Sequence, residues 1–438
     1  MNEKIALGLM SGTSIDGSVS AALLETDGEL SVQRLFATEH RYEDPAGPRP
    51  VHHLTKAAEG AYRKAKGDTP TASALYPEAL SEYVSATFGL SDPGDIQAKV
   101  KELAVAFFGD DAQLPTLADI VARSTEVHAA AAKKAIEQSG IARERVHYVG
   151  YHGQTLYHDP FINRVTVQVG DPQRLTRELG IPVVFDFRSN DVKNGGQGAP
   201  LAPVYHRALL HSHNVPSAAI VNLGGTANLT IVNSSSDELL GFDTGPANGL
   251  IDRYVKEKAG LALDADSALA LRGKVSEQAL SALLAHSIVL ADGRNYLDIP
   301  PPKSLDIRDY TYDVPELQRL SIEDGCATLN AFTAECVALG LEWPKKIGVE
   351  IPTTWVLCGG GAKSPHMRAQ LAERLALRLG APVEMKSADD LGWSAEGMEA
   401  ELFAYLAVRS ARGLPITFPG TTGVAAPLTG GTVFRAVS

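Results

Sequence analysis

Cysteine and long apolar runs are both scarce in this sequence. Only three of the 438 residues are cysteines, and their spacing fits neither a metal site nor a disulfide framework. We expect Cys326, Cys336 and Cys358 to be buried thiols in a reducing compartment, so the expected location is the cytoplasm. No apolar stretch is long enough to cross a bilayer and the N-terminus lacks the pattern of a signal peptide, so we expect no membrane partner.

Positively charged residues are also few relative to negatively charged ones. The 40 Lys and Arg residues are outnumbered by 52 Asp and Glu residues, and the net charge of −12 argues against a nucleic-acid partner. A hydrophobic content of 44% is typical of a globular protein. Because 438 residues are too many for one ordinary core, we expect two domains.

Short apolar runs and longer amphipathic stretches alternate along the chain. The first pattern predicts strands and the second predicts helices, and their alternation is typical of the α/β class. The helix predicted at 125–139 has Ser124 or Thr125 as its N-cap and Gly140 as its end. Strands are predicted at 5–10, 21–25, 146–149, 165–169, 182–185, 217–223, 229–232 and 355–358, and further helices at 201–211, 324–339 and 396–409.

Asp186 and Arg188 follow a predicted strand directly and precede the glycine-rich run Gly195–Pro200. Strand ends that open onto glycine turns are where α/β enzymes hold reactive groups. Taken alone, the Asp–Arg pair would be a structural ion pair. Because similar clusters follow other strands, we interpret Asp186 as the candidate catalytic residue.

Three turns combine glycines with strand ends in a way that suits a phosphate ligand. Backbone amides in such turns can approach an anion closely. The first turn lacks the Gly-Lys-Ser/Thr ending of a P-loop, and each turn alone would be an ordinary turn. Two of them open a strand pattern that restarts halfway along the chain, which suggests a nucleotide clamped between two related lobes. The candidate phosphate-binding residues are Ser11, Gly12, Thr13 and Ser14 in the first turn, Gly224 and Gly225 in the second, and Gly359, Gly360 and Gly361 in the third.

Neutral polar residues and two carboxylates complete the candidate sites. His152, Gln154 and Thr155 offer neutral donors and acceptors, which suits a sugar or an amide, although a surface loop explains them equally well. Asp16 and Asp243 are candidate contacts of Mg²⁺ or its water, because both are carboxylates beside glycine in strand-end turns.

In this order, the motifs resemble those of the anhydro-N-acetylmuramic acid kinase family. No single motif is specific, but the set covers the chain from residue 5 to about residue 410. The motifs are Gly8–Gly17, Tyr151–Thr155, Asp186–Arg188, Gly195–Pro200, Asn222–Gly225, Gly241–Pro246, Pro300–Ser304 and Cys358–Gly361.

The resemblance implies a fold, a reaction and roles for individual residues. The fold is the two-lobed sugar kinase/Hsp70/actin fold, which is ribonuclease H-like. One lobe would comprise residues 1–205 together with a C-terminal segment at about 395–438, and the other would comprise residues 206–394. The active site would lie in the cleft between the two lobes. Its members use ATP and Mg²⁺ to open the 1,6-anhydro ring of 1,6-anhydro-N-acetylmuramic acid with water and to phosphorylate O6, which gives N-acetylmuramic acid 6-phosphate in cell-wall recycling. Asp186 matches the family's catalytic aspartate, Arg188 and Gln197 join the neutral cluster as sugar-binding candidates, and the third glycine turn would bracket adenosine. The resemblance also favours a homodimer.

Two alternative functions stay open at this point. A levoglucosan-type kinase would apply the same chemistry to a simpler anhydrosugar. A nucleotide-gated binding protein of the same fold, without catalysis, is supported by Ser20, which stands where the family usually places an aspartate.

Overall fold

The computed structural model describes residues 3–11, 17–109, 113–233, 238–290, 293–304, 310–393 and 397–436. They fall into two compact units. Unit 1 is drawn from residues 1–198, 399–417 and 427–438, and unit 2 from residues 199–398 and 418–426. None of the helices in these ranges has the length and apolar character needed to cross a membrane.

Unit 1 is built on a six-stranded sheet with the order β13-β7-β4-β1-β2-β3. The first three strands of the chain form an antiparallel meander, and β4 and β7 then run parallel to β1. Apolar side chains from β1, β2 and β4 pack against α4 in the core of this unit. The strands are β1 (Lys4–Met10), β2 (Ser18–Thr26), β3 (Val32–Arg41), β4 (Val146–Tyr151), β7 (Val183–Phe185) and β13 (Thr432–Phe434), and a separate hairpin is formed by β5 (Gln154–Asp159) and β6 (Val165–Val169).

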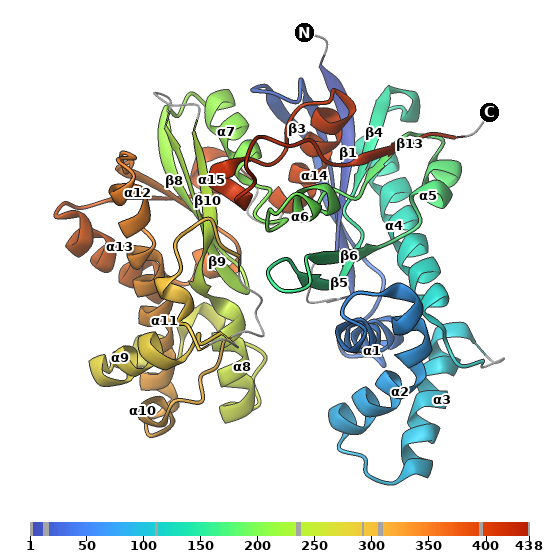
Figure 1. Cartoon of the computed structure of the whole chain (residues 1–438), viewed down its shortest axis with the longest axis horizontal. Coiled ribbons are helices and arrows are strands. Elements are labelled where there is room, and N and C mark those ends of the chain that lie inside the picture. The colour runs from blue at the N-terminus through green and yellow to red at the C-terminus, as the bar shows by residue number, and fades with distance from the viewer. Residues whose placement is uncertain are drawn as a thin grey trace. The chain divides into compact units, whose positions relative to one another are not determined.

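Three consecutive helices between β3 and α4 form a helical extension of unit 1, which Figure 1 shows in blue beside the β5–β6 hairpin. Their apolar faces share a core with residues of that hairpin. The helices of unit 1 are α1 (Pro50–Lys64), α2 (Thr69–Phe88), α3 (Pro93–Phe108), α4 (Leu117–Ser139), α5 (Pro172–Leu179), α6 (Ser189–Lys193) and α14 (Met398–Ala411).

Unit 2 repeats the same strand order in a five-stranded sheet, β10-β9-β8-β11-β12. Its first three strands form an antiparallel meander, and β11 and β12 run parallel to β8. The predicted echo between the two halves of the chain is therefore present in the strand order. The strands are β8 (Ser217–Leu223), β9 (Thr226–Asn233), β10 (Leu239–Pro246), β11 (Thr354–Cys358) and β12 (Glu384–Ser387).

Helices α8, α9, α10, α11 and α13 contribute apolar side chains to one large core with this sheet. Figure 1 shows α8, α9, α11 and α13 gathered in this unit. The helices are α7 (Pro203–Ser212), α8 (Asn248–Ala259), α9 (Glu277–His286), α10 (Pro315–Gln318), α11 (Ile322–Leu339), α12 (Glu342–Lys346), α13 (Pro365–Leu379) and α15 (Pro419–Thr422).

Helix α4 begins earlier than its sequence pattern predicts. The predicted N-cap, Ser124 or Thr125, lies inside the helix, where the Thr125 hydroxyl donates to the carbonyl of Val121 at 2.8 Å. The helix instead begins after Thr116, which forms a capping box with Asp119. A threonine inside a helix whose hydroxyl donates to the carbonyl four residues earlier can thus be mistaken for an N-cap when only the sequence is known.

A pair of glycines brings α14 against the sheet of unit 1. Gly8 of β1 lies opposite Gly150 of β4 in the parallel register. A Cβ atom at Gly8 would lie 1.8 Å from the carbonyl oxygen of Ala400, and one at Gly150 would lie 1.9 Å from that of Phe403. Only glycine therefore permits the helix backbone to contact these two strands directly.

The C-terminal segment returns to unit 1 after α15. Its strand β13 pairs antiparallel with β7, with Thr432 opposite Phe185. The sequence analysis did not predict this strand, because three residues are too few for a period to be read.

Candidate active site

Asp186 is the first residue after β7, at the carboxyl end of that strand. Its backbone is in the left-handed region with φ of +64°, which few residues other than glycine adopt. One carboxylate oxygen accepts from the amide of Ser189 at 3.2 Å, and the Asp186 carbonyl accepts from the amide of Gly431 at 3.2 Å. Asp186 is thus half-buried in a strained turn, with its carboxylate and its backbone carbonyl each held by one hydrogen bond, and strained backbone of this kind is common at active sites.

Arg188 joins the strand-end cluster to two other predicted motifs. Its Nη2 and Nε atoms lie 3.1 and 3.3 Å from Nε2 of His152, and its Nη1 donates to the Gly198 carbonyl at 2.6 Å. Nδ1 of His152 lies 2.8 Å from the Gly153 carbonyl, so the ring proton belongs on Nδ1. Burial, and after it the charge of Arg188, holds the pKa of His152 well below 6.5. His152 is therefore a neutral ring that fixes the guanidinium.

Ser11 belongs to a second buried network in unit 1. Its hydroxyl oxygen lies 3.1 Å from Oε1 of Gln154 and 3.1 Å from Nε2 of His128. Nδ1 of His128 lies 2.6 Å from the carbonyl of Ser124, which can only accept, so Nε2 carries a lone pair. Burial lowers the pKa of His128 from 6.5 to about 4. The single proton of the serine is thus shared between two acceptors.

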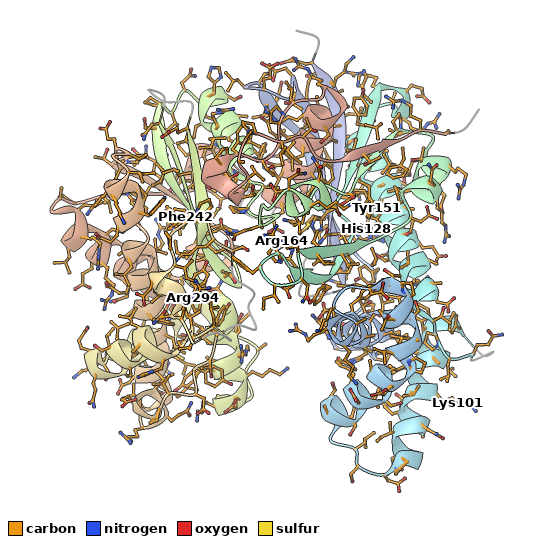
Figure 2. The ribbon with its side chains drawn as sticks, in the orientation of Figure 1. Lys101, His128, Tyr151, Arg164, Phe242 and Arg294 are labelled. Carbon is orange, nitrogen blue, oxygen red and sulfur yellow. The ribbon has the colours of Figure 1, made fainter. Side chains whose placement is uncertain are left out.

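His128 was missed by the sequence analysis. It lies on α4 in an alanine-rich stretch that predicts only a buried helix face, and Figure 2 shows it beside Tyr151, with ring centroids 4.9 Å apart. The remaining predicted residues of the first turn, Gly12, Thr13, Ser14 and Asp16, lie outside the described residues.

The other sugar-binding candidates lie on the neighbouring hairpin and glycine loop. The hydroxyl of Thr155 accepts from the amide of Gln168 across the β5–β6 hairpin at 3.3 Å. Gln197 lies in the loop before Gly198, and that loop is held by Asp191, whose carboxylate accepts from the Gly198 amide at 2.6 Å. Asp191 is only 1% exposed and was also missed, because nothing in its spacing separates it from a surface helix residue.

The second and third glycine turns lie side by side in unit 2. Strands β8 and β11 are parallel neighbours, with Cys358 opposite Asn222, so both strands end at the same edge of the sheet. A Cβ atom at Gly359, where φ is +78°, would lie 2.5 Å from Oδ1 of Asn222. A Cβ atom at Gly361 would lie 2.8 Å from Oδ1 of Asn248.

Asn248 joins the end of β8 to the third turn, because its side-chain amide also donates to the Leu223 carbonyl at 3.1 Å. Asn248 therefore links the end of β8 to the third turn. The turn at Gly224 and Gly225 is fixed as well, since the Gly225 carbonyl accepts from the hydroxyl of Tyr310 at 2.8 Å. The predicted phosphate and adenosine turns of this unit thus lie at one edge of the sheet, where Gly225 and Gly360 are exposed and Gly361 is buried.

Asp243 lies in β10 and is 9% exposed. Its amide donates to the Lys303 carbonyl at 2.9 Å, and its carbonyl accepts from the Tyr296 hydroxyl at 2.8 Å. No group of three metal-binding side chains gathers within the part of the chain that the structure describes. Mg²⁺ in nucleotide sites needs only one or two carboxylates besides water and phosphate, so a single aspartate fits its usual coordination.

The strand order and the strand-end turns together define a class of protein. Both sheets have three antiparallel strands followed by two parallel strands, which is the ribonuclease H-like order. Two such units in one chain, with glycine turns at the ends of the central strands, make this an α/β protein of the sugar kinase/Hsp70/actin class.

Comparison with known proteins gives the particular family. The sequence profile described as anhydro-N-acetylmuramic acid kinase matches residues 84–436. The anhydro-N-acetylmuramic acid kinase of Methylorubrum populi is 40% identical over 434 residues, which cover 99% of each chain. That of Methylobacterium nodulans is 39% identical over 431 residues, covering 98% of this chain and 99% of the other. The chain belongs to the anhydro-N-acetylmuramic acid kinase family.

Among solved structures, a ROK hexokinase from Thermus thermophilus matches 92% of this chain and 99% of its own, with 16% identity and a TM-score of 0.37. This sequence identity and this TM-score are too low to support a conclusion. The fold class is assigned from the strand order of the two sheets.

Proposed function

We propose that this chain uses ATP to open the 1,6-anhydro ring of 1,6-anhydro-N-acetylmuramic acid and to phosphorylate the oxygen that is released. The observation that carries the proposal is Asp186, a carboxylate fixed by the Ser189 amide at a strand end, in a chain of this family. Water attacks the anomeric carbon and gives its proton to Asp186, the bond from that carbon to O6 breaks, and O6 forms a bond to the γ-phosphorus as ADP leaves. The product is N-acetylmuramic acid 6-phosphate.

Asp186 suits the role of general base because its position is set before substrate arrives. The Ser189 amide leaves the rest of the carboxylate able to accept a proton from water. No protein acid is needed at O6, since the phosphoryl group captures that oxygen as it departs. Attack by water on the face opposite the bridging oxygen predicts inversion at the anomeric carbon.

The sugar is assigned to polar groups of unit 1. Arg188 is held in place by His152 and by the Gly198 carbonyl, so it can offer a fixed donor to an oxygen of the sugar. Gln154, Thr155 and Gln197 supply further neutral donors and acceptors, which suit hydroxyl and acetamido groups.

ATP is assigned to the glycine turns. Gly359, Gly360 and Gly361 would bracket adenosine, Gly224 and Gly225 would contact phosphate, and Ser11 would do so from unit 1. Asp243, together with Asp16, would hold Mg²⁺ or its water. The ion would supply charge neutralisation for the phosphoryl group, the main requirement of this reaction besides positioning.

The test is a product analysis in ¹⁸O-water with ATP and Mg²⁺. The label is expected at the anomeric carbon, with none in the new phosphate, and no ring opening is expected without ATP. Asp186→Asn should bind ATP and the sugar normally but lower turnover by about 10²–10⁴-fold, because only the base is removed.

Results other than these would contradict particular steps or assignments of the proposal. Label in the phosphate, or ring opening without nucleotide, would separate the two steps. Turnover of Asp186→Asn within about tenfold of the unchanged chain would remove this residue from the role. Turnover of levoglucosan but not of 1,6-anhydro-N-acetylmuramic acid would show that the chain is a levoglucosan-type kinase. Binding of ATP and sugar without any turnover would show that it is a binding protein.

A further inference from the structure

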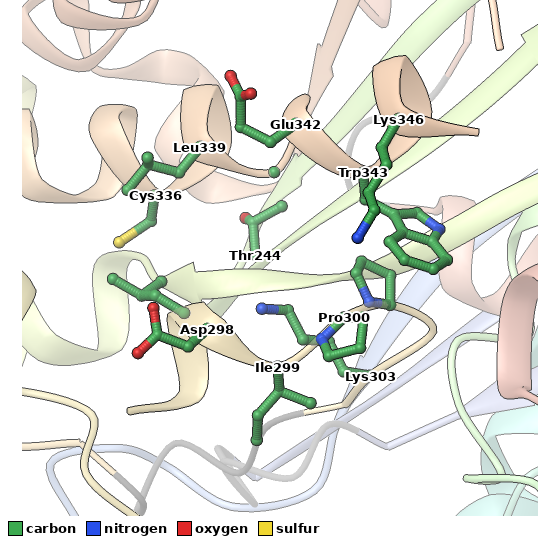
Figure 3. Close-up of a pocket in the computed structure, with 13 residues that line it drawn as sticks. Thr244, Asp298, Ile299, Pro300, Lys303, Cys336, Leu339, Glu342, Trp343 and Lys346 are labelled. Carbon is green, nitrogen blue, oxygen red and sulfur yellow. The ribbon is translucent and has the colours of Figure 1, made fainter. Parts of the chain in front are cut away.

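Unit 2 has a pocket to which the proposed reaction gives no role. Its volume is about 260 Å³, and it lies between the segment 297–303, the end of α11 and the short helix α12 (Figure 3). Leu297, Ile299, Leu339 and Trp343 supply apolar walls. None of the glycines assigned to the nucleotide lines it. The volume lies below the range of about 300–1,000 Å³ that is usual for drug-sized ligands, so the pocket suits a small metabolite.

A buried lysine reaches into this pocket. Lys303 is only 5% exposed, and Figure 3 shows its side chain extending into the space that the pocket residues enclose. Its ammonium donates to the Tyr296 carbonyl at 2.9 Å and lies 4.3 Å from the centre of the Tyr296 ring. An ammonium has three N–H donors, and within the described chain this carbonyl is the one acceptor that it reaches. A buried charge with donors to spare is costly unless a ligand completes its coordination.

The one buried charge of the pocket favours an anion. The lining carries two cations, Lys303 and Lys346, and two carboxylates, Asp298 and Glu342, so its charges sum to zero. Asp298, Glu342 and Lys346 are exposed to water, whereas Lys303 is buried. A ligand carboxylate would therefore pair with Lys303, the buried cation that has N–H donors to spare.

We propose that this pocket binds a small organic acid, with the carboxylate paired to Lys303 and the apolar body lying against Trp343 and Leu339. The site goes beyond the proposed kinase reaction, since a ligand here touches neither Asp186 nor the glycine turns. The strand that leads from this pocket towards the second glycine turn is β10, which contributes Thr244 to the lining. A bound acid would therefore contact an element that also carries Asp243.

The test measures binding of benzoate and of its neutral isostere benzamide to the full chain by titration calorimetry at pH 7. Benzoate is expected to bind at least tenfold more tightly than benzamide, because only benzoate pairs with the ammonium. Lys303→Met should lower benzoate affinity at least tenfold and leave benzamide unaffected. Lys345→Met is the matched control, since Lys345 lies on α12 but points its amine to the Arg378 carbonyl at 2.9 Å and does not line the pocket.

A further variant tests the proposal if Lys303→Met does not fold. Ile299→Trp fills the pocket and should abolish benzoate binding. Equal affinity for benzoate and benzamide, absence of benzoate binding, or binding that survives both Lys303→Met and Ile299→Trp would overturn the proposal.

Discussion

At the scale of single residues, two histidines besides His152 are held neutral inside the protein. His128 of unit 1 and His206 of unit 2 are 1% and 2% exposed, and each bonds through Nδ1 to a single acceptor or hydroxyl group. Burial lowers the pKa of both from 6.5 to about 4. Neither ring can gain a proton in the folded protein near neutral pH, whereas both can in the unfolded chain.

This difference predicts how stability depends on pH. The unfolded chain binds protons below about 6.5 and the folded protein does not, so the free energy of unfolding should fall as pH falls from 6.5 towards 4. Between pH 7.5 and pH 5 each histidine should contribute a loss of about 2 kcal/mol. Denaturant unfolding at the two pH values measures it.

The histidine prediction is checked by comparing variants, because other groups titrate in the same range. His128→Gln and His206→Gln should each show a smaller drop between the two pH values than the unchanged chain. His211→Gln, at an exposed position on α7, is the control and should show the full drop. An equal drop in all four proteins would contradict the assignment.

The candidate residues illustrate what a single sequence can and cannot predict at this scale. Asp186, Arg188 and His152 were all singled out from motifs, and the structure brings Arg188 into contact with His152; their roles stay predictions. His128 and Asp191 were not predicted. His128 contacts Ser11, which is distant in the sequence, and Asp191 accepts from the amide of Gly198 in the glycine loop. Such contacts leave no local pattern to read.

At the scale of elements, the clearest sequence signals were apolar strands bounded by glycine. The strand predicted at 217–223 is β8 with the same bounds, because both its ends are marked by turn residues. Helices α2 and α3 were not predicted, and α2 has Pro77 inside it, which a sequence pattern reads as a break. Tertiary packing on α1 and the β5–β6 hairpin outweighs this local preference.

The packing of the third glycine turn leads to a prediction with an internal control. Gly359 and Gly348 both have φ of +78°, but a Cβ atom meets Asn222 and Leu223 at Gly359 and open space at Gly348. Gly359→Ala and Gly348→Ala should therefore share a backbone cost of about 1 kcal/mol. Gly359→Ala should cost a further 1–3 kcal/mol, roughly, and should also weaken ATP binding, because its overlap displaces the ends of β8 and β11.

Thermal unfolding and ATP titration of both variants distinguish steric overlap from backbone strain. Gly348→Ala should bind ATP as the unchanged chain does. If the two variants lose the same stability and affinity, close packing between the second and third turns is not what requires glycine at position 359.

At the scale of the whole molecule, the last part of the chain supports the strand that leads to Asp186. Strand β13 covers the edge of β7, and the Gly431 amide donates to the Asp186 carbonyl at 3.2 Å. The side chain of Asn190 donates to the Thr429 carbonyl at 2.7 Å. Residues that follow Asp186 by more than 240 positions thus determine how firmly its turn is held.

Removing residues 427–438 should therefore destabilise unit 1 by about 2–4 kcal/mol, through several lost hydrogen bonds, and should lower turnover at least tenfold. Removing only residues 435–438 leaves β13 complete and should have little effect on either quantity. Thermal unfolding and turnover of the two shortened chains measure this. Similar losses in both, or full activity without β13, would show that the strand does not position Asp186.

The direct contact of α14 with Gly8 and Gly150 also sets an order of completion during synthesis. The strands of unit 2 are contiguous in the chain and have all been made by residue 387, whereas the sheet of unit 1, which begins with residue 4, acquires its covering helix and sixth strand only from residues 398–434. The first sheet to leave the ribosome is therefore the last to be finished, and its glycine-lined face stays uncovered while unit 2 forms. A nascent chain whose first 390 residues or so have left the ribosome would hold all the strands of the second sheet and an unfinished first one, so early contacts with a chaperone should concentrate on the N-terminal half.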